Sequence, residues 1–417
     1  MHNHPRPLAA LILTRAWYVQ SIFHRPAFAF IVKPELREKQ FTTEISLGTP
    51  GQLFKVQLST GTSNFWAPSA QCSTPTCSLH PRFDASLSST FQTNGTKFKI
   101  PLLTRGVFQE DSLLHYSDNN SGDEGNFLNG QLGNDKLMFA GGLIEIPNQS
   151  FGQVLGEQTK SGEGMKRVLA NDQFDGILGL GYQPEGRLTG RPFLLNLVDQ
   201  GLLDEPVFGI YLSKNRSDNG EEDDDTIGNQ LTLGGLDPSH YSDEGIEWHE
   251  VTRVAQGQRV IELTAFALRR EAFEIDGNAI IDSGFPYIAL TRYQAEMINI
   301  QIGAQETAPA SGHYELPCKN VPELFDFIIM FGQESYVLHG NEYVRRGEEG
   351  QLPSSPSPWS RHGKKKRSGA AVCQSMIIGM DFPKETGIIA IFGEVFLQKF
   401  YSAYDLDKGQ VGFALAT

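Results

Sequence analysis

The sequence predicts an all-β protein built from two similar lobes, and three observations support this fold class. The chain has 417 residues, which exceeds the usual size of one hydrophobic core. Its 43 glycines and 22 prolines are typical of many short strands joined by turns. A pattern also repeats: an apolar strand runs into a turn at 59–61 and again at 282–284, and each turn is followed later by an apolar pair and a glycine, at 177–179 and 391–393.

The first strands of the predicted N-terminal lobe start near residue 40. Apolar and polar residues alternate over 43–47 and over 54–58, which is typical of half-buried strands. A Gly-Thr-Pro-Gly turn at 48–51 separates the two segments. The second strand runs directly into the tight turn Ser59-Thr60-Gly61.

Apolar spacing also predicts the elements that come later in the chain. Residues 191–203 carry apolar side chains at helical spacing and predict a short amphipathic helix that stops at Gly201. Strands resume around 231–235, and the apolar segment 279–281 predicts a buried strand that ends at Asp282-Ser283-Gly284. If two such lobes face each other, their two turns meet at the junction, where binding sites are common.

Domain boundaries follow from this repeat. We expect an N-terminal lobe over 39–210 and a C-terminal lobe over 211–417. Residues 1–38 have no clear period and form a separate N-terminal segment, which we interpret as a remnant prosegment. Two polar stretches, about 101–126 and about 345–371, interrupt the pattern as insertions, and the second ends in a Lys/Arg run typical of a solvated loop.

Composition excludes several classes of function. Lys and Arg number 35 against 49 Asp and Glu, a formal net charge of −14, which argues against a nucleic-acid binder. No stretch approaches the ~18–20 apolar residues of a membrane span, and the apolar stretch at 8–13 is short for a secretory signal. We therefore expect no nucleic-acid partner and no membrane partner, and we expect a monomer.

Four cysteines are spaced as two local pairs. Cys72 and Cys77 are five residues apart, and Cys318 and Cys373 are 55 apart. The even count fits two disulfides formed in an oxidising compartment, and four reduced cysteines remain the alternative. A zinc site lacks the second nearby pair that it would need, so we expect neither metal nor cofactor.

Motifs in both halves, in one order, resemble the pepsin-like aspartic peptidases of the pepsin and cathepsin D type. This many motifs is far more specific than one Asp-Ser-Gly triplet, and the resemblance covers about residues 39–417 apart from the insertions. The segments that carry it are ISLGTPGQLF at 45–54, VQLSTGTSNFWAPS at 56–69, FDGILGLG at 174–181, LTLGGLD at 231–237, AIIDSG at 279–284, IFGEVFLQKFY at 391–401 and YDLDKGQVGF at 404–413.

The resemblance implies a bilobal acid-protease fold whose cleft holds one catalytic aspartate from each lobe. Asp282 matches the second aspartate, but Ser59 stands at the first position. Two carboxyl groups that share one proton act as acid and base on a water, and a serine hydroxyl cannot take either role. We therefore predict a catalytically impaired or inactive member.

The resemblance also assigns the surroundings of this pair. Gly61 and Gly284 match the family's turn glycines, and Thr60 and Ser283 match hydroxyls that cross-link the two turns. Thr62 keeps a hydroxyl after the first turn. The four cysteines fall where the family forms disulfides, Cys72 with Cys77 and Cys318 with Cys373.

Other positions depart from the family or leave two readings open. Phe285 replaces the hydroxyl residue expected after the second turn and is expected to reach into the cleft. The tyrosine of the family's flap falls on Asp123, and Tyr116 serves only if the polar insertion intervenes. Trp66 is either a cleft wall or a packed core residue, and Asp175 is expected to be structural.

The leading hypothesis is an impaired aspartic endopeptidase homologue that binds a peptide or protein in its cleft. One alternative is an active endopeptidase that works at acid pH. The other is a secreted protein without enzymatic activity, such as a binding or antigenic module. The family and the disulfides predict a secreted or endolysosomal protein.

Overall fold

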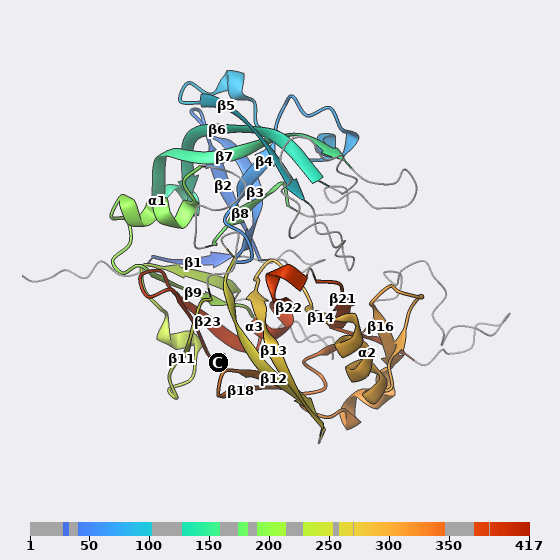
Figure 1. Cartoon of the computed structure of the whole chain (residues 1–417). Helices are drawn as coiled ribbons and strands as arrows, with labels where there is room; N and C mark the ends of the chain where they lie inside the picture. The colour runs from blue at the N-terminus through green and yellow to red at the C-terminus, as the bar shows by residue number, and fades with distance from the viewer. Residues whose placement is uncertain are drawn as a thin grey trace, which may run out of the picture.

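The computed structural model confirms a mostly β protein with the two-lobed architecture of pepsin-like proteases (Figure 1). The predicted strands at 43–47, 54–58 and 279–281 are present, and the strand predicted around 231–235 spans Asn229–Leu233, ending before Gly234. The residues that the structure describes are 28–32, 41–101, 127–158, 174–181, 190–213, 228–252, 258–269, 271–346, 371–382 and 384–417.

The N-terminal lobe is a sheet that closes on itself. Its strand order is β2-β3-β8-β4-β7-β6-β5, and an additional pairing of β2 with β6 completes a ring of six strands. Alternation in β3 places Phe54, Val56 and Leu58 inside this ring, each at most 2% exposed. The strands are β2 Thr42–Leu47, β3 Gln52–Ser59, β4 Phe65–Pro68, β5 Gln92–Pro101, β6 Phe127–Phe139, β7 Ile144–Gln158 and β8 Gly176–Gly179.

The C-terminal lobe contains a seven-stranded sheet, in the order β18-β17-β12-β13-β22-β14-β21, and a smaller sheet, β15-β16-β20-β19. The strands of the larger sheet are β12 Val260–Leu268, β13 Glu271–Ile281, β14 Ile288–Thr291, β17 Phe327–Phe331, β18 Glu334–Leu338, β21 Ile377–Met380 and β22 Ile388–Phe392. Those of the smaller sheet are β15 Gln305–Glu306, β16 Tyr314–Pro317, β19 Val344–Arg346 and β20 Val372–Ser375.

A six-stranded sheet lies between the two lobes, with the order β1-β10-β9-β23-β24-β11. Figure 1 shows β1 and β9 below the upper lobe, with β12, β13 and β18 of the lower lobe farther down. Segments from both ends of the chain therefore meet in this sheet. Its strands are β1 Phe28–Val32, β9 Val207–Tyr211, β10 Asn229–Leu233, β11 Glu247–Glu250, β23 Phe400–Asp405 and β24 Gln410–Leu415.

Helices are short. The predicted helix is α1, which begins after Pro192 and ends two residues before Gly201, whose φ of 63° does not continue a helix. A capping box at Thr291 starts the longest helix, α2. The α-helices are α1 Phe193–Asp199, α2 Arg292–Gln301 and α3 Glu394–Leu397. The 3₁₀ helices are η1 Pro75–Leu79, η2 Ala85–Leu87, η3 Ala140–Gly142, η5 Pro238–His240, η6 Cys318–Glu323 and η7 Lys384–Thr386.

The predicted boundaries of lobes and insertions stay predictions. The lobe boundary at 210/211 falls inside β9, a strand of the middle sheet. The first insertion starts at the last residue of β5 and the second starts inside β19. Most of both insertions, and residues 1–27, lie outside the described residues.

The internal repeat is a structural repeat of strands and turns. In the N-terminal lobe β3 runs parallel to β8, with Ser59 opposite Gly179. In the C-terminal lobe β13 runs parallel to β22, with Ile281 opposite Phe392. In each lobe, therefore, a buried strand pairs with a parallel neighbour and ends at a turn. This shared arrangement gives the two turns the same structure.

Candidate active site

The turns at the ends of β3 and β13 meet at the junction of the two lobes. The hydroxyl Oγ of Ser59 donates a hydrogen bond of 2.8 Å to Oδ1 of Asp282, across 223 positions of sequence. Ser59 is 5% exposed, and Asp282 is partly exposed. The structure thus brings together the two side chains that the sequence paired.

Buried hydroxyls lock the two turns to each other. Thr60 Oγ1 donates to the carbonyl of Ile281 (2.8 Å), and Ser283 Oγ donates to the carbonyl of Leu58 (3.0 Å). In return, the amide of Thr60 donates to Ser283 Oγ (3.2 Å) and the amide of Ser283 to Thr60 Oγ1 (3.0 Å). Thr60 and Ser283 are both 0% exposed, so all four bonds are shielded from water.

Oδ1 of Asp282 collects several donors. Besides Ser59, the amides of Gly61 (3.1 Å) and Gly284 (2.9 Å) donate to it. Burial raises the pKa of Asp282 above its ordinary value of 3.8, and the bonds from Gly284, Ser59 and Gly61 offset that rise only in part. The carboxyl group therefore keeps its proton to a higher pH than an exposed aspartate does.

Glycine is required where the turns touch. A Cβ at Gly61 would lie 2.4 Å from Cγ of Asp282, and one at Gly284 would lie 2.9 Å from Cβ of Ser59. Both distances are shorter than side-chain atoms tolerate, so any larger residue would push the two turns apart. The roles predicted for these glycines agree with this geometry.

Three other residues that the sequence assigned to the site are Thr62, Phe285 and Trp66. The hydroxyl of Thr62 accepts a bond from the amide of Asn64 (3.1 Å). Phe285 is partly buried and packs edge-on against Tyr287, with ring centroids 6.0 Å apart. Trp66 is 3% exposed and lies in a core cluster, which favours the packed-core reading.

Two further predictions concern the disulfides and the flap, and only the cysteines lie within the described residues. The structure pairs Cys72 with Cys77 and Cys318 with Cys373, which confirms both implied disulfides. The flap cannot be compared, because Tyr116 and Asp123 lie outside the described residues.

Asp175 has structural contacts, in line with its predicted role. Its Oδ2 accepts the amide of Lys55 (2.8 Å), and its Oδ1 lies 3.1 Å from Nδ1 of His80. These contacts tie β8 to β3 and to the segment that follows η1.

Sequence reasoning missed four residues that hold the site. Gln57 Nε2 donates to the carbonyl of Gly284 (3.0 Å) from the middle of β3. The other three are Leu180, Arg259 and Tyr404, which lie behind the turns. Gln57 stands at a polar position of the alternating strand, so nothing in the pattern distinguished it from an exposed residue, whereas an Arg directly before an apolar strand was the signal for Arg259.

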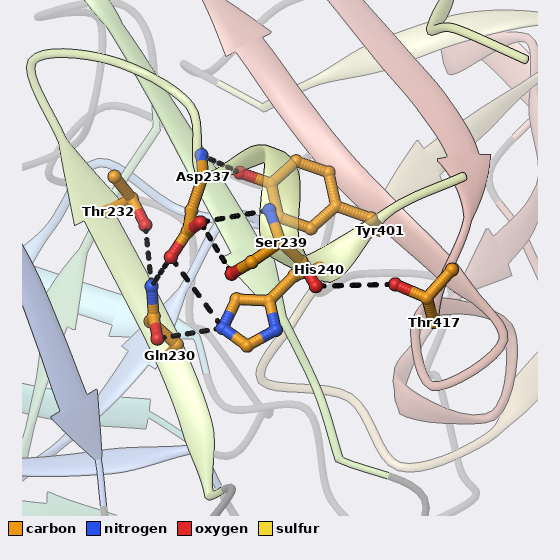
Figure 2. Close-up of polar contacts among 7 residues, drawn as sticks. All are labelled: Gln230, Thr232, Asp237, Ser239, His240, Tyr401 and Thr417. Atoms are coloured by element: carbon orange, nitrogen blue, oxygen red, sulfur yellow. Dashed lines mark hydrogen bonds and ion pairs between the residues drawn. The ribbon is translucent and has the colours of Figure 1, made fainter. Parts of the chain in front are cut away.

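A second polar cluster surrounds η5 and does not form a nucleophilic site (Figure 2). Ser239 Oγ donates to Asp237 Oδ1 (2.7 Å) and not to a histidine. His240 Nε2 lies 2.9 Å from Gln230 Oε1, and Gln230 Nε2 donates to Asp237 Oδ2 (2.7 Å). The cluster caps η5 and joins it to β10.

Neither a metal centre nor a membrane helix occurs within the described ranges. No group of three His, Cys, Asp or Glu side chains in them could hold a metal ion. None of the helices described there has the length and apolar character to cross a bilayer.

The Ser59–Asp282 pair is a carboxyl group that accepts a bond from a hydroxyl group. The carboxyl group can hold a proton or accept bonds from a bound ligand. The hydroxyl cannot share an acidic proton with it, because an alcohol ionises only far above the pH at which a carboxyl does.

Two β lobes joined by a middle sheet, with a matching turn from each lobe at the junction, define the class of pepsin-like aspartic proteases. The chain belongs to the eukaryotic aspartyl protease family, whose model matches residues 40–416.

Named relatives fit that assignment. Vacuolar protease A of Aspergillus fumigatus is 32% identical over 381 residues, covering 90% of this chain and 79% of the relative. The vacuolar aspartic protease of Candida albicans is 34% identical over 376 residues (90% and 75%). Cathepsin D of Gallus gallus is 30% identical over 379 residues (90% and 81%).

Proposed function

We propose that this protein binds peptide segments at the junction of its lobes and that its peptide-bond hydrolysis is severely impaired. One observation carries the proposal: the partner of Asp282 across the junction is the hydroxyl of Ser59, at 2.8 Å. The family membership supports peptide binding at this place, and the serine supports the loss of chemistry.

Hydrolysis at this site is impaired because one of the two required proton carriers is absent. Peptide hydrolysis by two carboxyl groups needs one of them ionised to take a proton from water and the other protonated to give one to the carbonyl oxygen. Ser59 donates a hydrogen bond to Asp282 and has no acidic proton to give to the substrate. Removing one member of such a unit commonly costs about 10⁴-fold in rate.

Ser59 is also a poor nucleophile in this setting. A serine that attacks a carbonyl needs an adjacent base, normally a histidine, to take its proton. Here the hydroxyl donates to Asp282, whose raised pKa still lies far below that of an alcohol. The carboxylate would therefore hold the serine proton only rarely.

A compartment follows from the chemistry and the relatives. Two disulfides indicate an oxidising environment. Two of the relatives are named as vacuolar proteases. We therefore propose that this protein is secreted or endolysosomal.

Binding and cleavage of a peptide separate the candidate functions. We expect saturable binding of the peptide inhibitor pepstatin by calorimetry at about pH 4, without cleavage of denatured globin. An Asp282→Ala variant is the control and should bind more weakly, because the inhibitor loses its carboxyl partner. Pepstatin-sensitive cleavage by the wild-type protein would overturn the impairment. Failure to bind would favour a non-enzymatic module.

A further inference from the structure

A fully buried arginine lies behind the two turns. Arg259 is 0% exposed and directly precedes β12. Its carbonyl accepts the amide of Ile281 (3.0 Å), the residue before Asp282. Guanidinium groups are rarely buried, because they stay charged at every physiological pH and lose their hydration.

The side chain of Arg259 reaches the other lobe. Its Nη2 donates to the carbonyl of Leu180 (3.0 Å), and the amide of Leu180 donates to the carbonyl of Ser59 (2.7 Å). The backbone of Arg259 therefore contacts the strand that ends at the Asp282 turn, and its guanidinium holds the residue bound to the Ser59 turn. One residue is linked to both halves of the site.

The middle sheet supplies the surroundings of this charge. The guanidinium carbon lies 5.0 Å from the ring centroid of Phe208 and 4.8 Å from that of Tyr404. The two rings stack on each other, with centroids 4.4 Å apart. Aromatic faces stabilise a desolvated cation, so the site can tolerate the charge.

The phenol of Tyr404 belongs to the same buried cluster as the guanidinium. Burial raises the pKa of Tyr404, and the hydroxyl of Ser402 and the charge of Arg259 lower it. The donors to Oδ1 of Asp282 are the Ser59 hydroxyl and the amides of Gly61 and Gly284. Two of these three donors belong to the turn that Arg259 contacts through Leu180.

We propose that Arg259 is a positioning residue for the site. Through Leu180 it holds the Ser59 turn against the Asp282 turn, and so keeps the Ser59 and Gly61 donors on Oδ1 of Asp282. If Arg259 only filled space in the core, a neutral side chain of similar length would leave both the turns and the pKa of Asp282 unchanged. Only the ligand-affinity readout rests on the proposed peptide binding.

Two variants break the link to Leu180 in different ways. Arg259→Gln keeps a donor on a shorter, neutral side chain, whereas Arg259→Lys keeps the charge and replaces the planar guanidinium. Arg292→Gln is the matched control, because Arg292 donates to Asp381 (2.7 Å) at a partly exposed site of the same lobe. Three quantities are measured: the titration midpoint of the Asp282 carboxyl carbon by NMR, hydrogen exchange of the Leu180 amide, and affinity for pepstatin.

In both variants we expect the Asp282 midpoint to rise by about half a pH unit or more, because the Ser59 turn loosens and its two donors, which favour the carboxylate, weaken. The Leu180 amide should exchange about tenfold faster in both variants, and the affinity for pepstatin should fall at least about threefold in both. The control should change none of the three quantities.

Unchanged titration and unchanged exchange in Arg259→Gln would overturn the proposal. If the Gln variant fails to fold, exchange at Leu180 in the Lys variant decides, and a wild-type rate there would overturn it. Absence of pepstatin binding by the wild-type protein would count against the proposed function alone. The titration and the exchange rates would still decide the role of Arg259.

Discussion

At the scale of single residues, the site depends on the hydrogen bonds and the burial of one carboxyl group, that of Asp282. Oδ1 of Asp282 accepts bonds from Ser59, Gly61 and Gly284, yet burial dominates and raises the pKa of the acid. A group held in this way costs stability when it ionises. Residues kept for binding commonly reduce stability in this manner.

Replacing Asp282 with asparagine should reveal that cost. Because the folded pKa lies above the ordinary 3.8, the acid's favourable contribution is complete below that pH and is lost as the pH rises. The melting temperature of Asp282→Asn, relative to wild type, should therefore be higher at about pH 6 than at about pH 3. Scanning calorimetry at both pH values measures this. Exposed Asp407→Asn is the control, and an equal difference at both pH values would contradict the prediction.

The sequence predicted the pair but not its support. Ser59 and Asp282 each end an apolar strand in a repeated turn, so symmetry alone predicted that they meet. Arg259 and Tyr404 reach the site from strands that pair with distant parts of the chain. Local periodicity does not show which distant strand lies behind a turn, so their roles needed the structure.

At the scale of elements, short caps join the strands of the middle sheet. The carboxylate of Asp237 caps η5 by accepting the amide (3.0 Å) and the hydroxyl of Ser239, and it also accepts Gln230 of β10 (Figure 2). The hydroxyl of Tyr401 lies 3.3 Å from the amide of Asp237, which links the cap to β23. The sequence had marked this segment only as part of a family motif.

Removing this cap should destabilise the protein. Asp237→Ala is expected to lower the free energy of unfolding by about 1 kcal/mol at about pH 7, and Asp237→Asn, which keeps an acceptor, by less. Burial alone would raise the pKa of Asp237, but hydrogen bonds from Ser239 and Gln230 and the charge of His240 lower it below 3.8.

The stability that Asp237 gives is therefore present above that pH and lost as the pH falls further. Urea unfolding at about pH 7 and about pH 3 measures both effects. If Ala and wild type differ equally at the two pH values, the carboxylate is not the stabilising group.

At the scale of the whole molecule, the site exists only where the two lobes meet across a middle sheet. The repeat and the composition were enough to predict two similar β lobes. They did not predict that β1 pairs with β10 about 200 positions away, with Phe28 opposite Leu233. Such pairings depend on the tertiary fold, which single-strand patterns do not record.

Two partly buried histidines should make the fold sensitive to acid. Burial lowers the pKa of His249 and of His313 below 6.5, and the charges of Glu247 and Glu306 oppose that shift only in part. A lowered histidine pKa gives stability above 6.5 that is lost as the pH falls, because the unfolded chain then binds more protons. Asp282 acts in the opposite direction.

The melting temperature of the wild-type protein should therefore fall between about pH 7 and about pH 5, and the double variant His249→Gln, His313→Gln should fall less. His339→Gln serves as an exposed control, since this histidine pairs with Asp326 at the surface. Equal decreases in wild type and the double variant would show that other groups govern the acid response.

The central claim is that Ser59 is what removes the chemistry from this site. Cleavage of denatured globin at about pH 4, with and without pepstatin, by wild type, Ser59→Asp and Ser59→Asn tests it most directly. We predict no pepstatin-sensitive cleavage by wild type or Ser59→Asn, and a gain of at least about 10³-fold in Ser59→Asp. Pepstatin-sensitive cleavage by the wild-type protein that Ser59→Asp does not increase would contradict the account.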